Sequence, residues 1–206
     1  SNHVLDATKA FALEVHNPLD AEGWPLTLRQ LAAQSYNRAF PDHATATPEA
    51  GPWRITLETS LYVPFMEHCR NTTLREQLYR AFITRAAQPP FDNTPLLTQI
   101  LQLRKEKAAL LGYPHFAAVS LMRKMAPSVE AIQAMYQQLQ AVGWPAAQRD
   151  LQELLAFKQS AGNPLPLQLW DVGFWAERLR ESRYAYTDEE IRPYFPFERV
   201  LDGLFR

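Results

Sequence analysis

The stretch Thr94–Gly112, TPLLTQILQLRKEKAALLG, decides the fold class. Its Leu and Ile side chains recur three or four residues apart, which is the spacing of one face of an α-helix. Pro95 suits the first helical turn, and Gly112 can end the helix in the left-handed conformation. The pattern therefore predicts a helix. Because similar patterns flank it on both sides, we expect a mainly α fold that resembles an array or bundle of helices.

Helical patterns run through nearly all of the chain from Ser60 onward. The expected helices cover residues 60–69, 72–83, 94–112, 116–125, 128–160 and 169–184. Thr59 or Ser60 can cap the first of them, and Asn71 or Thr72 the second. The run Gly143-Trp144-Pro145 must kink or divide the segment that Ser128 opens, so one long bent helix and two helices both fit.

The first 58 residues mix helices with a small β element. Helical spacing covers residues 4–11 and 28–40, and Thr27 can cap the second of these helices. Ala12–His16 and Trp53–Glu58 alternate as strands do, and we expect them to pair as an antiparallel, hairpin-like element. Two strands alone would make only an appendage. Residues 1–58 could form a sub-lobe, with residues 59–206 as a helical region.

The last stretch, Thr187–Arg206, reads TDEEIRPYFPFERVLDGLFR. Thr187 and Glu190 have the spacing of a capping box, so a helix should begin there. Pro193 and Pro196 should then stop or kink it, before a second helical segment over residues 198–205. Since the chain begins without Met and ends while an apolar face is still being built, we expect a piece of a longer protein.

Composition limits the classes of partner. The 206 residues are 47% hydrophobic and 21% charged, which suits a globular chain with a sizeable core. A formal net charge of −1 gives no electrostatic reason to expect nucleic acid or an anionic membrane as partner. The sequence holds no run of about 18 apolar residues that could span a bilayer. The single cysteine, Cys69, excludes an internal disulfide and fits a reducing compartment.

No residue pattern in the chain forms a complete catalytic or metal site. The five histidines are His3, His16, His43, His68 and His115. A zinc site of the zincin kind needs two histidines four residues apart on a helix, and no pair has that spacing. Glu67-His68 could belong to the inverted motif, but Pro64 occupies the position of the other ligand. Each histidine is therefore interpreted as a surface or capping residue, and Cys69 as a small, half-buried structural thiol.

The remaining candidates also favour structural roles. Asp188, Glu189 and Glu190 suit the dipole at the start of a helix without any catalytic role. Trp170 with Asp171, Phe174 and Trp175 could line a ligand groove, although aromatic residues at this spacing are more often core. The basic residues alternate with Glu76 and Glu106, which is typical of a solvated face rather than a nucleic-acid stripe. They are Arg75, Arg80, Arg85, Arg104, Lys105 and Lys107.

Several long stretches resemble the thimet oligopeptidase family of zinc peptidases, and within it the oligopeptidase A branch of bacteria and plant organelles. They are NHVLDATKAF at residues 2–11, TPEAGPWRITLETSLYVPFMEHCRNTTLREQLYRAFITRA at 47–86, LRKEKAALLGYPHFAAVSLMRKMA at 103–126, LWDVGFW at 169–175 and EEIRPYFPFERVLDGLF at 189–205. The resemblance covers essentially the whole chain in order, so it is far more specific than one short motif.

The resemblance implies a mostly helical enzyme whose two lobes face across a deep channel that admits short peptides. It also implies a zinc site made of H-E-x-x-H and a downstream Glu, in which the metal activates water and the motif Glu acts as base. None of those residues is in this sequence, because the resemblance places the chain upstream of that helix. No catalytic or metal residue is therefore assigned here, the substrate-binding residues stay open, and zinc is expected only in the parent enzyme.

Two hypotheses follow. In the first, the chain is a segment of a zinc endopeptidase, inactive alone, with short peptides and the missing catalytic lobe as partners and a cytoplasmic or plant-organellar location. In the second, the chain is a non-catalytic helical module that binds peptides or a partner protein. In both, exposed apolar surface would favour self-association.

Overall fold

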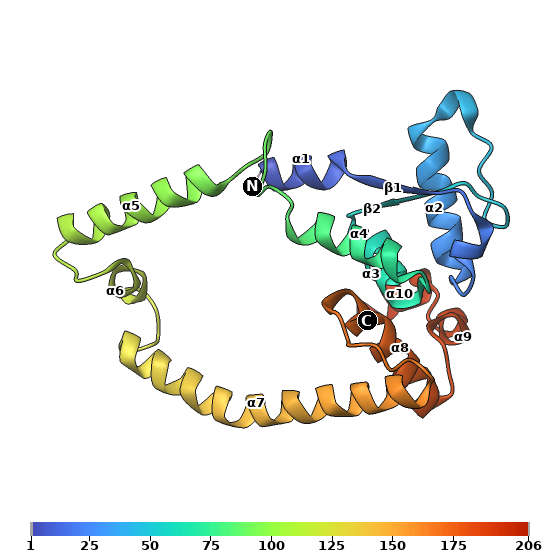
Figure 1. Ribbon diagram of the computed structural model, residues 1–206. Helices are drawn as coiled ribbons and strands as arrows, with labels where there is room; N and C mark the ends of the chain where they lie inside the picture. The colour runs from blue at the N-terminus through green and yellow to red at the C-terminus, as the bar shows by residue number, and fades with distance from the viewer. Residues whose placement is uncertain (1, 206) are drawn as a thin grey trace.

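The computed structural model describes residues 2–205, except for the side chains of Asp188 and Glu189. Over that range the chain is mainly helical and contains one two-stranded sheet (Figure 1), which confirms the predicted fold class. The first elements are α1 (Asn2–Ala10), β1 (Ala12–Val15), η1 (Pro18–Ala21), α2 (Leu26–Ala39), η2 (Pro41–His43), β2 (Trp53–Thr56), α3 (Thr59–His68) and α4 (Thr72–Ile83).

The two strands pair as the sequence predicts. β1 and β2 are antiparallel, with Leu13 opposite Ile55 and Val15 opposite Trp53. The sheet is more than the appendage that we expected, because β2 packs against α2 and α3 and supplies the centre of the core. Trp53 and Ile55 are completely buried. The helices give the strand pair the apolar cover without which an isolated pair is marginal.

One hydrophobic core unites the first 80 residues. Its large members include Trp24, which precedes α2, together with Leu28, Trp53, Ile55, Leu61, Phe65 and Leu78 from the sheet and from α2, α3 and α4. The ring of Trp24 contacts the rings of Trp53 and Phe65, with centroid distances of 5.8 and 5.2 Å. These edge contacts are the geometry that aromatic pairs prefer. The part of the molecule built on this core, α1 to α4, is called the body below.

After α4 the chain leaves the body. The next three helices are α5 (Thr94–Leu110), α6 (Phe116–Leu121) and α7 (Val129–Ser160). Figure 1 shows α5 running away from the body, α6 at the far end and α7 running back. We call α5, α6 and residues 129–150 of α7 the arm. α7 is a single helix of 32 residues that continues through Pro145, so of the two alternatives left open the single helix is correct.

The chain then returns to the body. η3 (Leu169–Asp171) packs against α4, and α8 (Val172–Tyr184) packs against α3 and the end of α7. The last elements are α9 (Asp188–Ile191), η4 (Arg192–Tyr194) and α10 (Phe197–Leu204). The two helical segments predicted for the C-terminal stretch are therefore confirmed. α10 has an apolar side, but Leu204 and Phe205 are largely exposed.

Three details at helix ends differ from expectation. Thr27 lies inside α2, which begins at Leu26, two residues before the predicted start, because Pro25 can precede a first turn without needing an amide donor. α6 ends at Leu121 rather than at Met125. At Thr187, the backbone N–H donates to Glu190 Oε2 over 2.6 Å as in a capping box, but the Thr187 hydroxyl donates to the same oxygen instead of accepting from an amide.

Candidate functional site

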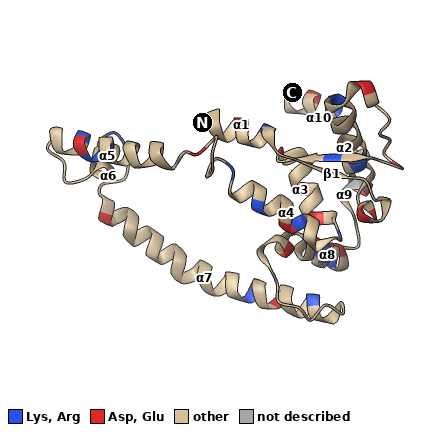
Figure 2. Cartoon of the chain, turned by 45° about the horizontal axis from the view of Figure 1, so that its top comes forward, with Lys and Arg blue, Asp and Glu red and all other residues tan. Residues whose placement is uncertain are grey.

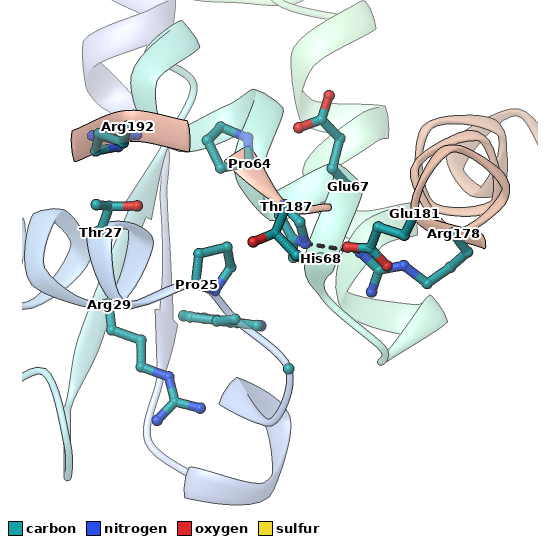
Figure 3. A pocket seen from close by; sticks show the side chains of 12 residues that line it. Pro25, Thr27, Arg29, Pro64, Glu67, His68, Arg178, Glu181, Thr187 and Arg192 are labelled. Atoms are coloured by element: carbon teal, nitrogen blue, oxygen red, sulfur yellow. Dashed lines mark hydrogen bonds and ion pairs between the residues drawn. The ribbon is translucent and has the colours of Figure 1, made fainter. Parts of the chain in front are cut away.

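A pocket of about 310 Å³ lies where the body meets α8 (Figure 3). The start of α2 contributes Pro25 and Arg29, the end of α3 contributes Glu67 and His68, and α8 contributes Arg178 and Glu181. Thr187 and Arg192 complete the wall from the segment after α8. The pocket therefore gathers charged groups of both signs from regions more than 100 residues apart in sequence.

His68 is held in this pocket by Arg178. The Arg178 Nη2 group donates to His68 Nδ1 over 3.0 Å and to Glu181 Oε1 over 2.7 Å. A guanidinium group can only donate, so Nδ1 of His68 is the acceptor and the neutral ring carries its proton on Nε2. Figure 3 shows the His68 side chain pointing toward Glu181 and Arg178. The arrangement fixes one ring orientation and joins α3 to α8.

The pocket has ionisable groups, but its described side chains do not form a metal-holding group. Within the described part of the chain, no group of three or more His, Cys, Asp and Glu side chains is placed to hold a metal ion. His68 accepts a hydrogen bond from the Arg178 guanidinium. Arg178, Arg192 and Glu67 give the pocket wall charged groups of both signs.

A second polar cluster lies under the start of α4. Arg75 forms a buried ion pair with Asp171 and donates from Nη1 to the carbonyl of Cys69 over 2.5 Å. Asp171 also accepts from the hydroxyl of Thr72 over 2.8 Å. The Arg75 guanidinium lies 4.5 Å from the centroid of the Phe174 ring. The contacts with Asp171 and Phe174 join α4 to η3 and α8, so the cluster fastens the returning chain to the body.

Lys158 is a third buried polar group. It is 1% exposed and lies in the last turn of α7. Its ammonium group donates to the backbone carbonyl and the side-chain oxygen of Asn163, over 3.1 and 2.8 Å, and to the carbonyl of Leu165. These oxygens replace the hydrogen bonds to water that the ammonium group loses on burial. The sequence analysis did not predict that Lys158 is buried. Its apolar neighbours Leu154 and Phe157 were the only sequence feature that could have indicated this burial.

The histidines that the sequence offered are spread over the molecule. His3 lies near the Phe91 ring, with 6.5 Å between ring centroids, and His16 lies 3.3 Å from the Glu14 carboxylate. His43 is in η2 and His68 is in the pocket. His115 caps α6, because its Nδ1 accepts from the backbone N–H of Ala118 over 3.2 Å. The interpretation as a capping residue is therefore confirmed for His115.

Cys69 is completely buried rather than half-buried. Burial raises the pKa of its thiol to about 11. At neutral pH the thiol is therefore uncharged, and a neutral, enclosed thiol is a poor nucleophile. This environment agrees with the interpretation of Cys69 as a packing residue.

The aromatic residues after Leu169 pack against charged side chains. The Trp170 ring lies 5.0 Å from the Arg80 guanidinium and 6.1 Å from the Tyr79 ring. Trp175 is buried, and the Phe174 ring lies 5.3 Å from its centroid. Trp170 therefore packs η3 against α4. Trp175 packs α8 against α7, where it contacts Phe157, as core aromatic residues do.

The predicted solvated face is correct in part. Arg80 forms an exposed ion pair with Glu76 over 2.7 Å, as i and i+4 residues on a helix surface do. For Arg75 the prediction is wrong, because Arg75 is 3% exposed and paired with Asp171. The sequence of α4 does not show that η3, which contains Asp171, covers this position. Of the acidic run, Glu190 accepts from Thr187, while the side chains of Asp188 and Glu189 lie outside the described residues.

Comparison with known proteins gives the family. The model of peptidase family M3 matches residues 65–206, which is well over half of the chain. The chain belongs to peptidase family M3. The match begins at Phe65 in α3 and includes α4, the whole arm and α8, together with most of the polar contacts described above.

Several similar proteins are named as oligopeptidases. The chain is 44% identical over its whole length to the probable cytosolic oligopeptidase A of Arabidopsis thaliana, and it covers 29% of that protein. It is also 44% identical to an organellar oligopeptidase A of Arabidopsis thaliana, of which it covers 26%, and 37% identical to oligopeptidase A of Haemophilus influenzae, of which it covers 30%. The chain thus spans less than a third of the length of these relatives.

Family M3 implies zinc in the parent enzyme. Zinc sites are built from three or four His, Cys, Asp or Glu ligands that converge on one point. The described side chains contain no such group, and His68 is oriented by Arg178. These residues do not fit a zinc site, so no catalytic step is derived from them. Among the described residues no helix is long and apolar enough to cross a membrane.

Proposed function

We propose that this chain is a stretch of a zinc-dependent oligopeptidase that cleaves short peptides. Its own part is to supply channel wall and support, while the zinc ligands and the base lie elsewhere in the parent protein. One observation carries the proposal: the chain resembles oligopeptidases A from end to end, yet it covers less than a third of their length.

The location and partners follow from the same relatives. Relatives named as cytosolic and as organellar both match over the whole chain, so a cytoplasmic or plant-organellar location is proposed. The partners are short peptide substrates, reached through the parent enzyme, and the catalytic lobe. Within the chain, residues 1–58 are proposed as a sub-lobe and residues 59–206 as the helical region that leads toward that lobe.

The proposal is tested by two measurements. In the reading frame that contains this chain, an H-E-x-x-H motif is expected after Arg206. The purified chain should bind no stoichiometric zinc and should leave a quenched fluorescent peptide uncut, whereas the parent protein should bind zinc and cleave the peptide. A stop codon directly after Arg206, or robust cleavage by the chain alone, would overturn the proposal. Peptide binding without cleavage by a chain that ends at Arg206 would favour the non-catalytic module.

A further inference from the structure

The chain exposes far more surface than a compact protein of its mass. Its accessible surface is 14584 Å². A compact monomer of 23.6 kDa exposes about 9,800 Å² by the empirical scaling of surface with mass. The difference of about 5,000 Å² is several times the roughly 800 Å² that one partner buries in a standard protein interface. The excess surface is therefore as large as the surface that obligate protein contacts cover.

Much of the exposed apolar surface lies on the arm. Figures 1 and 2 both show α5 and α7 standing apart from each other, and α6 packs against both. The exposed large apolar residues of the two long helices include Leu96, Leu97, Ile100, Leu101, Leu103, Leu110, Met135, Tyr136, Leu139, Val142 and Trp144. Exposed leucines scattered over a surface are ordinary, but exposed apolar residues that gather on one side of a helix mark an interaction surface.

Five apolar residues of α7 form a stripe along one side of the helix. Ile132, Met135, Leu139, Val142 and Ala146 follow one another at steps of three and four residues. This spacing places them on one side of the helix, which we call the α7 stripe. Leu139 is 62% exposed and Val142 is 76% exposed. The stripe has the pattern of a helix that packs against another helix.

Charge is missing from this part of α7. The segment Ala131–Gln148 contains no Asp, Glu, Lys or Arg, and Figure 2 shows the middle of the helix without charged residues. Helices that face water normally carry charged residues on the solvent side, whereas uncharged helices lie inside proteins. An uncharged surface also gives no attraction to phosphate groups of nucleic acids or lipids. The partner that it fits is the apolar side of another helix.

The same segment is poorly suited to stand alone. Gly143 and Pro145 lie inside it, and they disfavour a helix by about 1 and 3 kcal/mol relative to alanine. Helices in proteins gain most of their stability from packing an apolar face rather than from propensity. The middle of α7 is exposed on nearly every side in the described structure. It therefore needs contacts from a segment beyond residues 2–205.

We propose that the α7 stripe is an internal docking surface, covered in the parent protein by one or more amphipathic helices from outside this chain. The inference rests on the proposed function, because it takes the chain as part of a longer peptidase. Three observations point to this occupant. About 70% of the length of each relative lies outside the stretch that matches this chain. The exposed area is large, and the stripe is uncharged.

The test compares hydrogen exchange of α7 in the parent protein and in the 206-residue chain. In the chain alone, amides of residues 131–148 should exchange at least about 100-fold faster than in the parent, since local opening costs little where packing is missing. The matched variants are Leu139→Lys, on the stripe, and Gln137→Lys, two residues away on the opposite side of the helix. In the parent, L139K should speed exchange of this segment by about 10-fold or more, and Q137K should leave it unchanged.

A milder variant guards against misfolding of the parent. Leu139→Ala removes apolar contacts without adding a charge, and it should speed exchange in the parent but leave the chain alone unaffected. Equal behaviour of L139K and Q137K in the parent would overturn the proposal. So would equally fast exchange of residues 131–148 in the parent and in a dilute solution of the chain alone, because nothing in the parent would then cover the stripe. Exchange is measured without peptide, so a parent that protects α7 but cleaves nothing refutes only the proposed function.

Discussion

Arg75 in α4 and Asp171 in η3 form a buried ion pair, although 96 residues separate them in sequence. Their side chains are 4% and 9% exposed. A buried pair of this kind is weak evidence for added stability, since both charges lose water on folding. Its loss is nevertheless costly, because the remaining charge is left in an apolar environment. The pair therefore holds the two ends of the arm together and makes their separation unfavourable.

Removal of the Asp171 charge should destabilise the chain strongly. We expect Asp171→Asn to lower the free energy of unfolding by about 3–5 kcal/mol, because Arg75 stays buried without a countercharge. The measurement is urea unfolding followed by fluorescence. Glu76→Gln is the control, since its pair with Arg80 is exposed and should contribute less than about 1 kcal/mol. The double variant Arg75→Met, Asp171→Leu should recover part of the loss. Equal, small effects of the first two variants would contradict this role.

Lys158 should be essential to the loop after α7. Lys158→Met keeps the apolar part of the side chain but leaves oxygens of Asn163 and Leu165 without their donor. We expect a loss of about 1–3 kcal/mol, together with faster hydrogen exchange in residues 161–168. Lys124→Met is the control, because Lys124 is exposed and bonds only to Ser120 over 3.0 Å. If both lysine variants unfold at the same urea concentration, the buried ammonium contributes nothing.

Cys69 should make stability fall in alkaline solution. Its pKa is raised to about 11 from 9.0 by burial, so the unfolded thiol ionises first as the pH rises. The folded state keeps its proton longer, and the stability from this group is therefore complete below pH 9 and is lost between about pH 9 and 11. The loss should reach roughly 2–3 kcal/mol at most. Cys69→Ala should flatten that part of the stability curve. Rapid labelling of native Cys69 by a thiol reagent at pH 7 would contradict its burial.

Asn71 should stabilise the start of α4 in two ways. Its side-chain oxygen accepts from the backbone N–H of Thr73 and Leu74, over 3.0 and 3.3 Å, and its amide donates to Asp20 over 2.8 Å. We expect Asn71→Ala to cost about 1–2 kcal/mol in thermal unfolding. Asn71→Ser should restore the cap but not the contact to Asp20, and exposed Thr73→Ala serves as the control. No difference between Asn71→Ala and Asn71→Ser would mean that capping is unimportant here.

Local patterns in the sequence predict much of the fold. The helical face of Thr94–Leu110, the cap at Asn71 and the alternation of Trp53–Thr56 each depend on neighbours close in the chain, and the structure confirms all three. The role of the sheet was underestimated. Burial of Trp53 needs α2 and α3 on one side, and strand alternation alone does not report which distant helices cover a strand.

The polar clusters could not be predicted from local patterns. Arg75 has the spacing of a surface residue on α4, and only the return of Asp171 after the arm buries it. His68 meets Arg178 across 110 positions in the same way. Contacts of such long range depend on how helices pack, which helical periodicity does not encode. By contrast, the family is recognisable in the sequence because several long stretches match it in order.

The contact between Arg75 and Asp171 also links the segment before the arm to the segment after it, so the arm resembles a closed loop. Closing a flexible loop costs entropy that grows only slowly with loop length, by about 0.6 kcal/mol for each doubling. Turns gained or lost in α5 and α7 would therefore change the reach of the arm while costing the body little. In this architecture the length of the arm and the stability of the body are separate properties, which evolution or an engineer could vary independently.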